Sequence, residues 1–88
     1  LTDAVKRFAA LGAQGAVGDC LLELAIVHAD EGELMHAGRL WGAGQALLEQ
    51  SHHRASRHRA ITPLPEDALA EGAAMSPEEA VKYAIAPA

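Results

Sequence analysis

The side chains best suited to chemistry in this sequence are six imidazole and guanidinium groups within one stretch of eight positions. They are His52, His53, Arg54, Arg57, His58 and Arg59. A zinc site on a helix typically uses two histidines four residues apart, together with a third ligand. The histidines of this stretch are one, five and six residues apart, and no acid lies between Gln50 and Ile61. The spacing therefore predicts that this stretch binds no metal.

Phosphate recognition is the other chemistry that residues 52–59 could serve. Arginine and histidine side chains donate hydrogen bonds to phosphate oxygens, so nucleic-acid binding is an alternative function. Proteins that bind single strands interleave such donors with aromatic side chains that stack on bases, and this stretch has none. The whole chain also carries a formal charge of −5. We therefore expect no nucleic-acid partner, and interpret these basic groups as complements to the negative end of a helix.

The remaining reactive side chains lack the partners that catalysis or metal binding would require. His28 lies on an apolar helix face, where a general base or metal ligand would need a second polar partner, and none is visible. We therefore expect His28 to be a core-edge histidine that is satisfied by a backbone or acid partner. His36 falls between the apolar positions and is expected to be solvated. Cys20 has neither an accompanying base nor an oxyanion site, so it is expected to be a packing residue. These patterns predict a protein that is not an enzyme and that holds no metal or cofactor.

A helical hairpin over residues 16–51 must position most of these groups. Apolar residues recur at helical spacing on both sides of a turn at residues 30–33. Those before the turn are Val17, Leu21, Leu24 and Ala25, and those after it are Leu34, Ala37, Trp41, Gly44 and Leu48. Gly32 stands where a left-handed residue commonly ends a helix. The glycines within the second helix predict a close approach of neighbouring helices; they are Gly38, Gly42 and Gly44.

Two shorter helices are expected beside the hairpin. Residues 1–11 predict an N-terminal helix whose buried face is Val5, Phe8, Ala9 and Leu11. Residues 76–79 read as a capping box with proline at the first helical position. They open a helix of about nine residues, which is too short to persist alone and must dock on the hairpin or on another chain. Residues 52–67 predict a basic helix end and a proline-containing linker. The sequence thus predicts an all-α chain in three parts, 1–51, 52–67 and 68–88.

Length and composition limit the class of protein further. A chain of 88 residues allows one small domain. Its single cysteine excludes an internal disulfide and fits a reducing compartment. No run approaches the roughly 20 apolar residues of a membrane span, and no signal peptide is visible. We therefore expect a cytoplasmic protein without a membrane partner. Because it opens on Leu1 rather than on methionine, we also expect it to be a segment of a longer protein.

The hairpin carries the spacing of a helical repeat. Ala4, Phe8 and Leu11 fall 33 residues before Ala37, Trp41 and Gly44. A period near 34 in a helix–turn–helix unit is typical of tetratricopeptide arrays. The residues at the positions of that repeat are Leu21, Leu24, Ala25, Gly32, Ala37 and Trp41, with Phe8 in the preceding repeat. The hairpin therefore resembles a tetratricopeptide unit, although His28 stands where an aromatic residue is usual and the terminal proline is absent.

A narrower resemblance covers residues 8–49 and 70–81. The strings FAALGAQGAVGDCLLELAIVHADEGELMHAGRLWGAGQALLE and AEGAAMSPEEAV resemble the C-terminal tetratricopeptide region of LuxR-type and AfsR-type bacterial transcriptional regulators, which are signal-transduction ATPases. Between the two blocks, the proline-containing residues 52–67 replace a further long helix of that family. The resemblance implies a non-catalytic protein–protein interaction module within a transcriptional regulator.

This resemblance leads to two expectations about packing and partners. Repeats of this kind stack on one another, so the partner would be upstream repeats of the same protein or a segment of another protein. Trp41 is expected to be mostly buried against Leu21, Leu24 and the N-terminal helix near Phe8. The isolated chain is expected to self-associate, because the apolar face of the N-terminal helix has lost its repeat partner and needs cover.

Overall fold

The computed structural model describes residues 2–51 and 64–86, and within them every regular element is an α-helix. The helices are α1 (Thr2–Ala10), α2 (Gln14–Asp30), α3 (Leu34–Ser51), α4 (Glu66–Ala73) and α5 (Pro77–Ile85). No strand occurs in these two ranges, so the prediction of an all-α chain is confirmed. None of the described helices combines the length and the apolar character needed to cross a bilayer.

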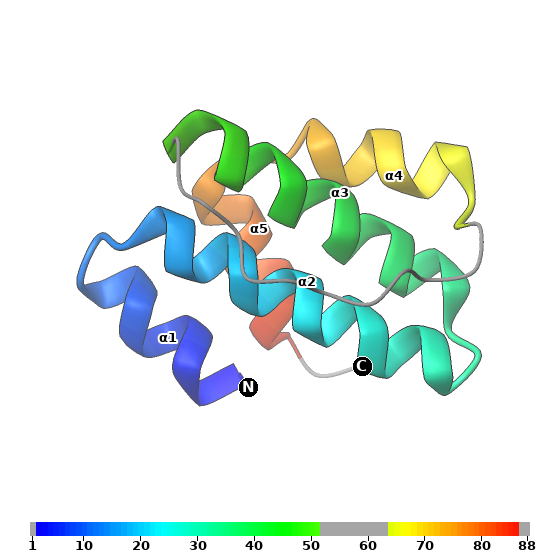
Figure 1. Cartoon of the computed structure of the whole chain (residues 1–88), viewed down its shortest axis with the longest axis horizontal. Coiled ribbons are helices and arrows are strands. Elements are labelled where there is room, and N and C mark those ends of the chain that lie inside the picture. The colour runs from blue at the N-terminus through cyan, green and yellow to red at the C-terminus, as the bar shows by residue number, and fades with distance from the viewer. Residues whose placement is uncertain (1, 52–63, 87–88) are drawn as a thin grey trace.

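The two longest helices, α2 and α3, run side by side as the antiparallel hairpin that the sequence predicts (Figure 1). The turn between them is a Schellman motif. The N–H of Glu33 donates to the carbonyl oxygen of His28 at 2.9 Å, and the N–H of Gly32 donates to that of Ala29 at 3.0 Å. Gly32 has φ of 84°, a left-handed conformation that glycine adopts at little cost. The predicted turn is therefore confirmed, while α2 begins at Gln14, earlier than the expected residue 16.

Glycines bring the helix backbones into direct contact on two sides of α3. Between α2 and α3, a Cβ added at Gly18 would lie 2.9 Å from the carbonyl oxygen of Gly44, and one at Gly44 would lie 2.8 Å from that of Gly18. Between α3 and α4, a Cβ at Gly42 would overlap the backbone of α4, and one at Gly72 would overlap the backbone of α3. The predicted close approach of neighbouring helices is confirmed, and α4 is the second partner.

α4 occupies part of the chain that the sequence assigns to a linker. The linker was expected to extend to residue 67, but α4 begins at Glu66. Glu66 and Asp67 lie in its first turn, where carboxylates complement the positive end of a helix. α4 lies along α3 on the side away from α2, so α3 is the middle helix of a three-helix layer (Figure 1).

α5 begins at the predicted capping box. The N–H of Glu79 donates to Ser76 Oγ at 3.1 Å, and the N–H of Ser76 donates to Glu79 Oε1 at 3.0 Å. The bond from the Ser76 N–H lowers the pKa of the Glu79 carboxyl, and the Ser76 side chain lowers it further. α5 packs against α1, α2 and α3, and it buries Ala80 and Ala84. The sequence predicts that this helix docks either on the hairpin or on another chain. The structure shows it docked within its own chain.

α1 is covered by α5, which changes two expectations. Val5 is fully buried and Phe8 is half-buried. Leu11 was predicted to share that buried face, but it is 74% exposed because α1 ends at Ala10 and Leu11 belongs to the following turn. Since Val5 is covered within the chain, a bare N-terminal helix is no longer a reason to expect self-association.

The core is centred between α2 and α3. Its largest fully buried side chains are Leu21, Leu40 and Val5. Trp41 was predicted to be mostly buried, but it is half-buried at the edge of this core. One residue along a helix turns the side-chain direction by about 100°, and the neighbouring Leu40 takes the inward position instead, with 1% exposure. Leu34, expected on the same apolar face, is exposed at the start of α3.

Candidate functional site

The histidine- and arginine-rich stretch lies outside the described residues. Its members are His52, His53, Arg54, Arg57, His58 and Arg59. The expectation that this stretch binds no metal, and the alternative of nucleic-acid binding through it, therefore stay predictions.

The residues that the sequence resemblance singles out as repeat positions form packing contacts. Leu21, Leu24, Ala25 and Ala37 are buried, Phe8 and Trp41 are half-buried, and Gly32 forms the turn. All of these except Gly32 pack in or against one hydrophobic cluster, built mainly from α2 and α3. They position the surfaces of the molecule and bring no polar groups together.

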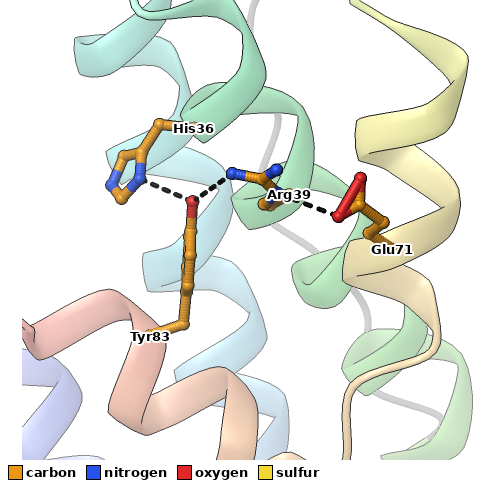
Figure 2. A network of polar contacts seen from close by, with 4 residues as sticks. All are labelled: His36, Arg39, Glu71 and Tyr83. Carbon is orange, nitrogen blue, oxygen red and sulfur yellow. Dashed lines mark hydrogen bonds and ion pairs between the residues drawn. The ribbon is translucent and has the colours of Figure 1, made fainter.

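One group of described polar side chains converges where α3 faces α4 and α5 (Figure 2). The Tyr83 hydroxyl on α5 lies 2.7 Å from His36 Nδ1 and 3.4 Å from Arg39 Nη1, both on α3. Arg39 Nε in turn donates to Glu71 Oε2 on α4 at 3.4 Å. One tyrosine and one arginine therefore connect three helices.

His36 also meets a second histidine. Its ring lies edge-on to His28, with centroids 4.2 Å apart and planes at 75°, and His28 Nδ1 lies 3.1 Å from Glu33 Oε1. His28 was predicted to be a core-edge histidine with a backbone or acid partner, and the hairpin turn supplies that acid, Glu33. His36 was expected to be solvated, and this is wrong because α5 supplies Tyr83 to it.

The electrostatics of this cluster favour a neutral His36 ring. Burial lowers the pKa of His36 below its ordinary value, and the neighbouring His28 lowers it further. A neutral imidazole in the tautomer protonated at Nε2 accepts at Nδ1 from the Tyr83 hydroxyl, whose oxygen can then accept from Arg39. Tyr83 in the first place, and Glu71 next, raise the pKa of Arg39. The cluster is a set of matched donors and acceptors that locates α5 on α3.

Replacing Tyr83 by phenylalanine tests this set of contacts. The change removes the hydroxyl and leaves Nδ1 of half-buried His36 without its partner, so the free energy of unfolding should fall by about 1–2 kcal/mol. Urea denaturation followed by circular dichroism measures it. Glu71→Gln is the matched control, because it alters only a contact between largely exposed groups and should cost less than about 0.5 kcal/mol. A Tyr83→Phe variant as stable as the parent would contradict the role given to the hydroxyl.

A cavity of about 370 Å³ opens between α1, α2, α3 and α5. Its apolar walls include Ala9, Val17, Leu47 and Val81, and its polar groups are Gln14, Glu78 and Lys82. Ligand-binding cavities typically measure roughly 300–1,000 Å³ and combine apolar walls with a few polar groups. No local sequence pattern predicts this cavity, because its walls come from four helices and the turn after α1.

Cys20 lies in the core, as predicted for a packing residue. Burial raises the pKa of its thiol, and the nearby carboxylates of Glu23 and Asp19 raise it further. The thiol therefore stays protonated at neutral pH, which makes it a poor nucleophile.

This shift predicts slow alkylation of Cys20 and a stability that falls in alkali. The native chain should react with iodoacetamide at pH 8 far more slowly than the urea-unfolded chain. Above about pH 8.5 the unfolded thiol loses its proton while the folded thiol retains it, so unfolding is favoured as the pH rises. Comparing the pH dependence of the parent with that of Cys20→Ala isolates this contribution. Equal alkylation rates in the folded and unfolded chains would show that the thiol is accessible and ionised.

Comparison of the chain with protein families, curated proteins and solved structures finds no match. The geometry of the chain itself therefore carries the functional argument.

Proposed function

We propose that this chain is a non-catalytic helical module that binds a segment of another protein, and that its α2–α3 hairpin is a unit of the tetratricopeptide type. The observation that carries the proposal is the cavity between α1, α2, α3 and α5. Its apolar walls suit a large apolar side chain of a partner, and Glu78 and Lys82 offer charged groups beside it. Apolar anchors that fill such pockets supply most of the affinity in protein–protein interfaces.

The partner class follows from the size and lining of the cavity. A volume of about 370 Å³ accommodates one or two side chains, so a short peptide segment with an aromatic or leucine anchor suits it. Neighbouring helical repeats of the same protein could supply such a segment, which is how stacked repeats bury their apolar faces.

The parent protein is proposed to be a bacterial transcriptional regulator of the LuxR or AfsR type. Support comes from the residue strings over 8–49 and 70–81, which resemble the C-terminal region of those regulators. Reading the gene upstream of the codon for Leu1 tests this assignment. Further helical repeats or a P-loop ATPase encoded there would support it, and a gene whose remainder encodes an unrelated enzyme would refute it.

The binding function is tested by selecting partners on the intact chain. A phage-displayed library of random twelve-residue peptides is panned against the purified protein. We expect enriched peptides that carry a large apolar residue and bind in the micromolar range. Failure to enrich any peptide would refute the proposal.

A substitution that fills the cavity and a neighbouring one that does not provide a matched pair of variants for the binding test. Ala9 lines the cavity, whereas the adjacent Ala10 is exposed and does not. Ala9→Phe should abolish peptide binding, and Ala10→Phe should leave it unchanged. Val81→Phe fills the cavity from the α5 wall and serves as a second blocking variant if Ala9→Phe unfolds. Peptides that bind all three variants equally would place binding elsewhere on the molecule.

A further inference from the structure

Three metal-ligating side chains meet where α2 ends. His28, Glu31 and Glu33 each offer a ligand atom, and these atoms all lie within 4.8 Å of one another. Within the cluster, His28 Nδ1 and Glu33 Oε1 lie 3.1 Å apart. Ligands held at about 2.1 Å in a tetrahedron are roughly 3.4 Å apart, so small rotations of the two glutamate side chains would bring all three atoms to one ion.

The backbone beneath these three residues is held by hydrogen bonds. The N–H of Glu31 donates to the carbonyl oxygen of His28 at 3.1 Å, and the N–H of Glu33 donates to the same oxygen at 2.9 Å. Gly32 between them takes the left-handed conformation that closes the Schellman motif. The three Cα positions therefore belong to one defined turn, and only side-chain rotations remain free.

The imidazole of His28 also contacts a second aromatic ring. His36 packs edge-on against it, and Tyr83 holds His36 by the 2.7 Å hydrogen bond. This ring contact limits rotation of the His28 imidazole, and contacts that orient the ligands are characteristic of metal sites. His28 is half-buried, whereas the two glutamates reach solvent and give an ion a path of entry.

The charge of the turn favours a cation. Two carboxylates are crowded beside the C-terminal end of α2, which carries the negative end of the helix dipole. Arg39, the arginine of α3, is directed to Tyr83 and Glu71 (Figure 2). A divalent ion would compensate the two negative charges at the turn.

We propose that His28, Glu31 and Glu33 form a binding site for a divalent transition-metal ion of the zinc type. The imidazole nitrogen selects such ions over magnesium and calcium, which prefer ligand sets made of oxygen alone. Water completes the coordination. The ion ties the last turn of α2 to the start of α3, so its binding stabilises the folded hairpin. The sequence predicts no metal for this protein, because no spacing rule places Glu33 back on His28.

The experiment uses the full chain with the three histidines of residues 52–59 replaced. His52→Gln, His53→Gln and His58→Gln are combined, so that residues 52–59 contribute no imidazole. Calorimetric titration of this triple variant with zinc chloride should show one ion per chain, with a dissociation constant on the order of 10 μM or lower. Magnesium chloride should give no saturable heat at the same concentrations. Zinc should also raise the melting temperature.

Additional substitutions locate the site. His28→Gln or Glu33→Gln, added to the triple variant, should weaken zinc binding by at least about tenfold. Glu23→Gln, an exposed acid on α2 outside the cluster, is the control and should change nothing. Cobalt(II) absorption provides a second readout, since loss of the imidazole ligand should remove the visible band of the bound ion. Absence of zinc binding by the triple variant would overturn the proposal, as would binding that survives His28→Gln.

Discussion

Replacing Leu21 by alanine is expected to lower the free energy of unfolding by about 3–5 kcal/mol. Leu21 is fully buried at the centre of the α2–α3 interface. Its truncation removes apolar surface from the core and leaves a void that two helices in backbone contact cannot close. A domain of this length has a total stability of only about 4–13 kcal/mol, so the variant should be largely unfolded at elevated temperature.

Urea denaturation of Leu21→Ala and Leu11→Ala provides a matched comparison. Both changes delete the same atoms from a leucine, but Leu11 is 74% exposed. Leu11→Ala should therefore change the free energy of unfolding by less than about 0.5 kcal/mol. Similar losses at the two positions would mean that the core is not centred between α2 and α3.

Gly42→Ala is expected to displace α4 from α3. The added Cβ would overlap the carbonyl oxygen of Leu69 and lie 3.1 Å from the nitrogen of Ala73. Both are backbone atoms of α4, so no rotamer change relieves the overlap and the whole helix must move. Overpacking of this kind costs about 1–3 kcal/mol, whereas alanine alone would favour an isolated helix by about 1 kcal/mol over glycine. A net loss of stability in Gly42→Ala would therefore show that the backbones of α3 and α4 are in close contact at this position.

Nuclear magnetic resonance locates the effect of Gly42→Ala. Amide shifts should change along α4 and the facing side of α3, and α4 should lose protection against hydrogen exchange. Gln45→Ala, at an exposed position of the same helix, should leave both unchanged. A Gly42→Ala chain more stable than the parent would show that α4 does not depend on this close approach.

The parts of the fold that could be predicted from the sequence are those determined by near neighbours. Ser76 and Glu79 are three residues apart, and their capping box forms as expected. Gly32 closes the hairpin turn because the left-handed conformation is a local property of glycine. The apolar spacing likewise identifies α2 and α3, since an amphipathic face repeats every three or four residues.

The features that could not be predicted, namely the burial of individual side chains and the polar contacts, depend on residues that are distant in the sequence. Trp41 and Leu11 carry strong apolar signals, yet Leu40 takes the inward position beside Trp41, and Leu11 lies in the turn after α1 ends. α4 was partly missed because the prolines before it predict a linker and its short, alanine-rich sequence has little periodicity. His36 and Tyr83 are 47 residues apart, and no spacing rule joins them. The cluster could be found only after α5 was placed on α3.

The packing of α1 against α5 has a consequence for the order in which the chain folds. The α2–α3 hairpin closes across a three-residue turn, so it requires little loss of chain entropy and should nucleate early. α1 precedes the hairpin in the sequence and α5 follows it. The contact between them therefore closes a loop of nearly the whole chain. Such a contact forms late and opens first. We therefore expect α1 and α5 to exchange their amide hydrogens together, ahead of the hairpin, as one cooperative unit whose opening uncovers Val5 and Phe8.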